Sequence, residues 1–93
     1  FNLKTVSELV TEIADVPTYL TFDLDLLNPS ELCGTGCPEP GGISFTDLNE
    51  ILMFFKKINI VGLDVVELCP ILDQSGLSSI VAAKVVRELL LTL

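Results

Sequence analysis

The chain has 93 residues, 49% of them hydrophobic and 19% charged, and its formal net charge at pH 7 is −8. Its five basic residues are scattered, which excludes a surface that follows a nucleic-acid backbone, and no apolar stretch approaches the roughly 20 residues that span a membrane. Because the chain contains no histidine, it cannot by itself form a Ser/His/Asp triad, a Cys/His dyad or a zinc site with histidine ligands.

Three helices are expected from the spacing of the apolar residues. The first covers residues 3–14. The second covers residues 44–58, where Ser44 and Asp47 form a capping box at its start. The third covers residues 77–92, and its surface is almost wholly apolar except on one side, so most of it should be buried.

Two strands alternate with these helices. Residues 18–24 (TYLTFDL) are rich in β-branched and aromatic side chains, and residues 60–67 (IVGLDVVE) are mostly apolar. This order predicts one α/β domain over residues 1–93, with a parallel sheet that has helices on both faces in a three-layer α/β/α arrangement. Right-handed crossovers would bring the carboxyl ends of both strands to one edge of the sheet, where α/β folds bind ligands.

Three carboxylates are expected at that edge. Asp23 and Asp25 end the first strand, and Glu67 ends the second. Residues two apart in a strand point to the same side, and two close carboxylates repel unless protons or a cation neutralise them. Carboxylate oxygens suit Mg²⁺, Ca²⁺ and Mn²⁺. The alternative is that Asp23 and Asp25 cap the following loop by accepting backbone N–H groups.

The loop over residues 26–43 is rich in glycine and proline and contains two of the three cysteines, Cys33 and Cys37. The third is Cys69, and this odd number with irregular spacing predicts reduced thiols. Cys33 and Cys37 have the spacing of half a zinc site, but the chain has no second pair of ligands to complete it.

Two stretches resemble the ureohydrolase (arginase/agmatinase) family. Residues 19–42, YLTFDLDLLNPSELCGTGCPEPGG, resemble the family's D-x-D strand and the P-G-T-G-T-P loop that follows it. Residues 62–70, GLDVVELCP, resemble its later G-x-D-[IV]-V-E segment, and Asp73 follows in the expected place. The family's G-G-D-H and D-A-H-x-D segments do not occur in this chain. The resemblance therefore implies the C-terminal third of an arginase-like α/β domain.

The resemblance also implies an activity, the manganese-dependent hydrolysis of a guanidinium group to urea and an amine by a hydroxide that bridges two Mn²⁺ ions. Asp23 resembles the carboxylate that bridges the ions, Asp25 a ligand of one ion, and Glu67 the residue that binds the guanidinium. No residue of this chain resembles a catalytic acid or base of the family. Since most metal ligands belong to the absent segments, the isolated chain is expected to be inactive.

Some positions depart from the family pattern. Asn28 stands where the family usually has Asp, Cys37 where it has Thr, and Cys33 where it has Pro. Asn28 and Cys37 are expected to lie beside the metal ligands and to orient them without holding metal. PEPGG at 38–42 favours an agmatinase-like enzyme of polyamine biosynthesis, whereas LCPILD at 68–73 is closer to the arginases of arginine metabolism. Another guanidino or formimino hydrolase of the family is a further alternative.

The family resemblance further implies a homo-oligomer, a trimer or hexamer, and the expected reduced thiols predict a protein of the cytoplasm or the mitochondrial matrix. An alternative function of a different class is that of a non-catalytic acidic α/β module, or of a degenerate family member, that binds a cation or a partner protein. The gene sequence upstream of the codon for residue 1 distinguishes the two, because the enzyme requires the G-G-D-H and D-A-H-x-D segments there.

Overall fold

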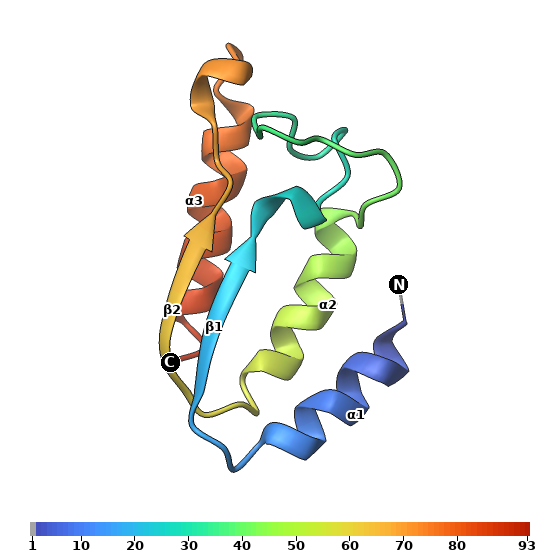
Figure 1. The fold of residues 1–93 in the computed structure, drawn as a ribbon, viewed down its shortest axis with the longest axis vertical. Coiled ribbons are helices and arrows are strands. Elements are labelled where there is room, and N and C mark those ends of the chain that lie inside the picture. Colours follow the sequence, from blue (N-terminus) through green and yellow to red (C-terminus); the bar gives the residue numbers. More distant parts are fainter. Residues whose placement is uncertain (1) are drawn as a thin grey trace.

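The computed structural model describes residues 2–93, and it contains three α-helices and two β-strands, as predicted (Figure 1). Along the chain these elements are α1 (Leu3–Ile13), β1 (Thr18–Asp23), α2 (Phe45–Phe55), β2 (Ile60–Val66) and α3 (Leu77–Leu90). Each element ends earlier than the sequence predicted. The predicted capping box at the start of α2 is present, because the side chain of Ser44 accepts from the N–H of Asp47 and the side chain of Asp47 accepts from the N–H of Ser44.

The two strands pair in parallel, as predicted. Leu20 pairs with Leu63 and Phe22 with Val65, so that these four apolar side chains share one face of the sheet. The other face carries polar groups. There the hydroxyl of Tyr19 donates to Oδ2 of Asp64 at 2.9 Å.

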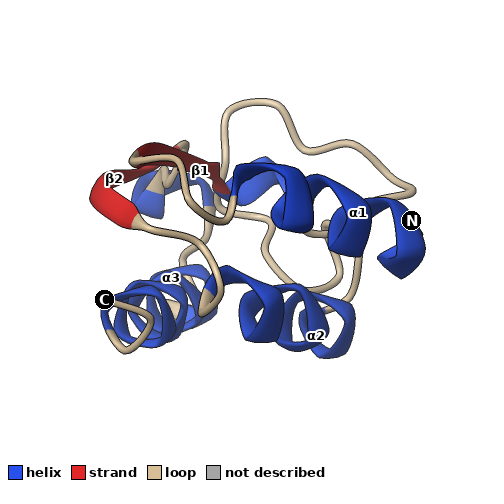
Figure 2. Ribbon diagram, turned by 90° about the horizontal axis from the view of Figure 1, so that it is seen from below, coloured by secondary structure: helices blue, strands red, loops and turns tan. Residues whose placement is uncertain are grey.

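The helices lie mainly on one face of the sheet. Figure 2 shows α2 and α3 together in a layer beneath the strands, while α1 lies beside β1 and packs against α2. Within residues 2–93 no helix covers the opposite face, where the side chain of Tyr19 is 62% exposed. The parallel α/β arrangement is thus confirmed, and of its two expected helix layers the chain contributes the one formed by α2 and α3. None of the helices in this range has the length and apolar character needed to cross a membrane.

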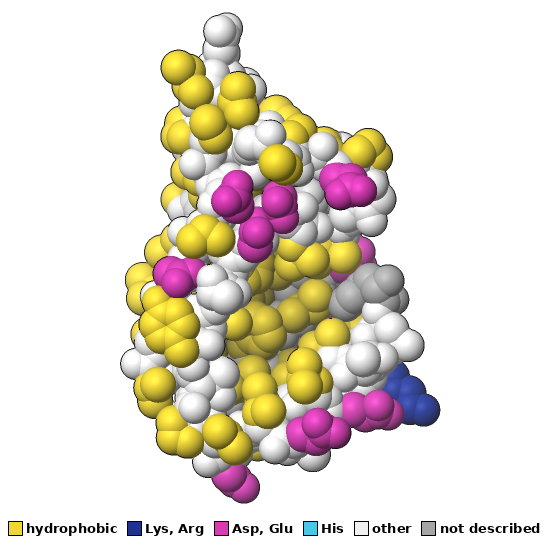
Figure 3. Space-filling model, in the orientation of Figure 1, with side chains coloured by type: hydrophobic (Ala, Val, Ile, Leu, Met, Phe, Trp, Pro, Cys, Tyr) yellow, Lys and Arg dark blue, Asp and Glu magenta, His cyan; other side chains and the backbone are white. Residues whose placement is uncertain are grey.

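The hydrophobic core lies between the strands and this helix layer. Its fully buried members include Leu24, Leu48, Val85 and Leu89. In α3 the buried residues recur at helical spacing and form a single stripe. The remaining apolar residues of α3 are largely exposed, which corrects the expectation that most of this helix is buried. A further apolar hollow of about 310 Å³ opens between α1, β1 and α2 (Figure 3).

The base of the long loop is closed beside η1, a 3-10 turn at Leu24–Leu26. Ile43 donates its N–H to the carbonyl of Leu26 at 3.0 Å and accepts from the N–H of Asn28 at 2.9 Å. The side-chain oxygen of Asn28 also accepts from the N–H of Gly41 at 3.1 Å. A Cβ at Gly42 would lie only 2.6 Å from the backbone of this turn, so the close approach of the two segments requires glycine.

The middle of the loop is held by a second set of contacts, which we call the Asp73 clamp and which consists of Gly34, Asp73 and Ser78. The N–H of Gly34 donates to Oγ of the buried Ser78 at 2.8 Å. The hydroxyl and N–H of Ser78 in turn donate to Oδ2 of Asp73. A Cβ at Gly34 would lie 2.7 Å from the Cβ of Ser78, so only glycine fits here.

The carboxylate of Asp73 is strongly stabilised in its ionised form. Hydrogen bonds from the hydroxyls of Ser75 and Ser78, together with the N–H of Ser78, hold the pKa of Asp73 well below its usual range. These donors outweigh the opposing effect of desolvation. Asp73 is thus an anion at neutral pH and a strong acceptor for the side chain of Ser78.

β2 ends at Val66 because the next residue leaves the extended conformation. Glu67 has φ of +72°, the one positive φ of a residue other than glycine within residues 2–93. For a residue with a Cβ this left-handed conformation costs about 1–2 kcal/mol. Strain of this kind persists only where the surrounding structure enforces it, and it is often found at functional sites.

Replacing Glu67 should reveal this strain. Glu67→Gly is expected to be more stable than Glu67→Ala by about 0.5–1 kcal/mol, which is the left-handed penalty less the extra chain entropy that glycine loses on folding. Urea unfolding of both variants measures the difference. At Val66, whose φ is not positive, the order should reverse, with Val66→Gly less stable than Val66→Ala. The same order at both positions would contradict the strain at Glu67.

Acid should weaken the fold through Asp73. The folded-state pKa of Asp73 is lowered from 3.8, so as the pH falls the unfolded chain binds this proton first. The stabilisation is therefore complete above about pH 5 and is lost as the pH falls through 4 and below. Urea unfolding of the wild type and Asp73→Asn over about pH 2–7 should show a stability difference that is largest at neutral pH. A difference that stays constant in acid would contradict this role of Asp73.

Candidate functional site

The carboxyl ends of β1 and β2 lie at the same edge of the sheet, as the parallel pairing requires. Asp23 is the last residue of β1, and Glu67 directly follows β2. Figure 3 shows a group of acidic side chains at the surface where the two strands end. The carboxylates that the sequence predicted for one edge of the sheet are therefore brought there by the fold.

The structure corrects the predicted placement of Asp25. This residue lies in the 3-10 turn Leu24–Leu26 and not in the strand, so the same-side rule for residues two apart in a strand does not apply to it. The chain turns here because Oδ1 of Asp23 accepts from the N–H of Asp25 at 3.0 Å and caps the turn. Asp23 thus has the loop-capping role that the sequence left open as an alternative.

The carboxylates nevertheless influence one another. The pKa of Asp25 is raised, first because its carboxyl lies within hydrogen-bonding reach of Asp23 and next because it is partly removed from water. The negative charges of Asp23, Glu67 and Glu39 raise it further. The parallel pairing places Asp23 and Glu67 at one edge of the sheet, with Asp25 in the turn that follows β1, while the roles of the three residues stay predictions. We call these three residues together with Glu39 the carboxylate cluster.

Glu39 is the member of the cluster that the sequence did not predict. It lies on the exposed part of the long loop and lines a cavity of about 240 Å³ together with Asp25 and residues 40–42. In the sequence Glu39 occurs only within PEPGG at 38–42, a stretch that indicated similarity to agmatinases but no role for this residue. Its place beside Asp25 depends on the closure of the loop at Asn28 and Ile43.

The carboxylate oxygens of the cluster are of the ligand type that divalent cations prefer. Carboxylate oxygens prefer hard cations, and a cation would relieve the repulsion between the negative charges near Asp25, which adds to the effects of its hydrogen bond with Asp23 and of desolvation in raising its pKa. The carboxylates are too few, however, to complete a metal site by themselves. Within residues 2–93 no group of three or more Asp, Glu, Cys or His side chains is placed to hold a metal ion. Asp23 and Asp25 could therefore supply only part of a metal centre.

The other predicted site residues lie around the cluster. Asn28 uses its side chain to hold Gly41 and Ser30 in the loop, and its expected role beside metal ligands stays a prediction. Cys37 is exposed on the same loop. Cys33 and Cys37 are both free thiols, and no further ligand joins them in the described part of the chain, so the zinc alternative gains no support.

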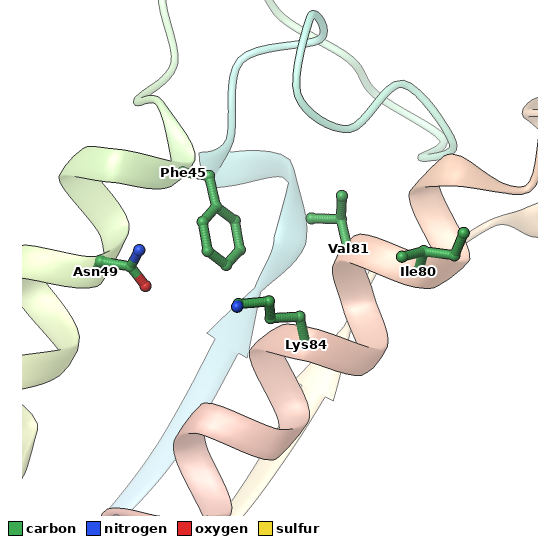
Figure 4. Close-up of a pocket in the computed structure, with 5 residues that line it drawn as sticks. All are labelled: Phe45, Asn49, Ile80, Val81 and Lys84. Atoms are coloured by element: carbon green, nitrogen blue, oxygen red, sulfur yellow. The ribbon is translucent and has the colours of Figure 1, made fainter.

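A separate pocket lies between α2 and α3 and belongs to neither strand end (Figure 4). It has a volume of about 350 Å³ and is lined by Phe45, Asn49, Ile80, Val81 and Lys84. The ammonium nitrogen of Lys84 lies 6.0 Å from the centre of the Phe45 ring. The pocket has no carboxylate in its lining, which distinguishes it from the carboxylate cluster.

Comparisons with known proteins agree with this geometry. An agmatinase from Chromobacterium violaceum is 43% identical over 86 residues, which cover 92% of this chain and 27% of that protein. A crystal structure from Clostridium difficile, also 43% identical, has a TM-score of 0.91 and is matched over 98% of this chain and 34% of its own. The arginase from Bacillus subtilis is 30% identical with a TM-score of 0.84, over 95% of this chain and 32% of that one.

The chain therefore spans about a third or less of the length of the proteins that it matches. The model of the arginase family matches residues 2–92, a range that includes both strands, the long loop and all members of the carboxylate cluster. The resemblance to the ureohydrolase family that two stretches of the sequence indicated is confirmed over nearly the whole chain, and this chain belongs to the arginase family.

Proposed function

We propose that this chain supplies one part of the active centre of a manganese-dependent ureohydrolase, which converts a guanidinium compound to urea and an amine. The observation that carries the proposal is the meeting of Asp23, Asp25 and Glu67 at one sheet edge, in a chain similar to agmatinases and arginases. A homo-oligomer is also proposed from the family resemblance alone, and the cytoplasm or the mitochondrial matrix from the three free thiols.

Asp23 and Asp25 would hold the metal in this proposal. Asp23 uses one oxygen to cap the turn that carries Asp25, which fixes the two carboxylates relative to each other and leaves lone pairs free for a cation. When bound, manganese supplies positive charge that makes water a nucleophile at neutral pH. The remaining ligands belong to segments of the whole enzyme outside residues 2–93.

Glu67 would bind the substrate. A guanidinium group presents N–H donors in a planar fork that matches the two oxygens of a carboxylate. Such a pair fixes the plane of the guanidinium and therefore the direction from which its central carbon can be attacked. Within residues 2–93 the Glu67 side chain accepts no hydrogen bond and is exposed, so its oxygens are free for this role.

The charge around the cluster favours an agmatine-like substrate. The five Lys and Arg residues all lie in the helices or directly after α2, and none lies in the loops that carry the carboxylates. A substrate with a distant amine is attracted by Glu39 and its neighbours, whereas the α-carboxylate of arginine is repelled. An excess of kcat/KM for agmatine over arginine supports this preference, and the reverse order would indicate an arginase.

Three substitutions in the whole enzyme test the division of roles. Asp23→Asn should lower both manganese content and rate, and Asp25→Asn should lose activity that excess manganese partly restores. Glu67→Gln should keep the manganese yet lose about tenfold to a few hundredfold in kcat/KM, the value of a charged hydrogen bond. Metal analysis and steady-state kinetics measure these effects.

A matched control for these variants is Glu50→Gln on the exposed side of α2, which should change neither quantity. If Glu67→Gln lost manganese while Asp23→Asn retained it, the roles assigned to the two residues would be wrong. If all three variants behaved as the control does, the carboxylate cluster would not be the active centre.

The isolated 93-residue chain should form no urea from agmatine or arginine and should bind Mn²⁺ weakly, because the two proposed ligands do not complete a metal site. Urea assays and manganese titration by calorimetry on the purified chain measure both properties. Turnover by a preparation free of any full-length enzyme would show that the chain needs no further segment for catalysis.

A further inference from the structure

The backbone that follows Glu67 is connected to Asp73 by a continuous set of hydrogen bonds. The N–H of Cys69, two residues after Glu67, donates to the carbonyl of Gly34 at 2.7 Å. The N–H of the same Gly34 donates to Oγ of Ser78 at 2.8 Å, and Ser78 donates to Asp73. Gly34 is therefore held on one side by the Glu67 segment and on the other by the start of α3.

Glu67 needs such support from outside. Its left-handed backbone is strained, and within residues 2–93 its own side chain accepts no hydrogen bond that would hold it in place. The restraint must therefore come from the backbone on either side. On the strand side this is the ladder with β1, and on the other side it is the contact between Cys69 and Gly34.

Asp73 determines which way the Ser78 hydroxyl points. A hydroxyl has one proton to donate and two lone pairs to accept with. Because Ser78 gives its proton to the ionised Asp73, its oxygen is left to accept from the N–H of Gly34. Without the carboxylate the hydroxyl is free to rotate, and the N–H of Gly34 loses a partner of defined orientation.

We propose that Asp73 is a positioning residue for the reaction: through Ser78 and Gly34 it holds the backbone at Cys69 and so keeps the carboxylate of Glu67 in the place where it receives the guanidinium group. This inference rests on the function proposed above. It assigns to the Asp73 clamp a role in substrate binding and none in metal binding, because the clamp is connected to Glu67 and not to the turn that carries Asp25.

The test uses variants of the whole enzyme that break the clamp in different ways. Asp73→Ala removes the acceptor, and Ser78→Ala removes the linking hydroxyl. Gly34→Ala removes no polar group but places a Cβ 2.7 Å from the Cβ of Ser78. The matched control is Gly36→Ala in the same loop, where an added Cβ meets nothing within 4 Å and φ is not positive.

All three clamp variants should lower kcat/KM by about tenfold or more with manganese content unchanged, and Gly36→Ala should behave as the wild type. In a Glu67→Gln background, Asp73→Ala should cause little further loss, because both changes act on the same interaction. Asp73→Asn, which retains an acceptor oxygen for Ser78, should recover part of the activity. An equal loss from Asp73→Ala in both backgrounds would overturn the positioning role.

Hydrogen–deuterium exchange followed by mass spectrometry gives a readout that does not depend on activity. Peptides that contain the amides of Gly34 and Cys69 should exchange faster in the clamp variants than in the wild type, and no faster in Gly36→Ala. Unchanged exchange in folded clamp variants would also overturn the proposal. If Asp73→Ala fails to fold, Gly34→Ala and Ser78→Ala decide the matter alone.

The two proposals fail in different ways. An intact wild-type enzyme without ureohydrolase activity would refute the proposed function, whereas the exchange data would still show whether the clamp restrains the Glu67 segment. An active enzyme whose clamp variants keep full kcat/KM would retain the proposed function and refute the role of Asp73.

Discussion

Both hydrogen-bonding groups of the Gly34 backbone are occupied by segments from the second half of the chain, and this double contact connects the long loop to the backbone that follows Glu67 and to the start of α3. Its carbonyl accepts from Cys69 and its N–H donates to Ser78. The loop is also joined to the body of the protein at its base near Asn28, by the Glu31 side chain, which accepts from the N–H of Phe45, and by Leu32, which is buried in the core. A Cβ has no room at Gly34, so the contact requires glycine for its small size in addition to the two backbone hydrogen bonds.

The carboxylates of this protein lie in two different electrostatic situations. The pKa of Asp25 is raised by its hydrogen bond with Asp23 and by desolvation, and further by the negative charges of Asp23, Glu67 and Glu39. Asp73 lies in the opposite situation, because its charge is satisfied by hydroxyl and N–H donors and its pKa is lowered. The structure thus separates a carboxylate that is stabilised by hydrogen-bond donors from a carboxyl group whose pKa is raised by its acidic neighbours and by desolvation.

The apolar composition of the chain is also explained by its architecture. One face of the sheet is buried by α2 and α3, whereas the hollow beside β1 and the outer side of α3 leave apolar side chains in contact with solvent. Exposed apolar surface of this extent is uncommon in small soluble proteins. It accords with the observation that the chain spans about a third or less of the proteins to which it is similar.

Local sequence patterns were sufficient to predict the α-helices, the strands and part of the candidate site. Apolar periodicity, the capping box at Ser44 and the runs of β-branched residues predicted the three α-helices and both strands, and their alternation predicted the parallel pairing. The D-x-D stretch and the GLDVVE segment placed Asp23 and Glu67 at strand ends, because these features depend on neighbours close in the chain. The family followed from the same two stretches.

Only the tertiary structure showed that Asp25 leaves the strand, that Glu67 is left-handed, and that Glu39 joins the cluster. It alone revealed the Asp73 clamp, in which Gly34 and Ser78 meet across 44 positions of sequence. Such contacts depend on how whole segments pack together, so they cannot be predicted from the residues that neighbour each partner in the sequence. The sequence therefore determined which elements form and which family they belong to, while packing decided which side chains share one site and what holds them there.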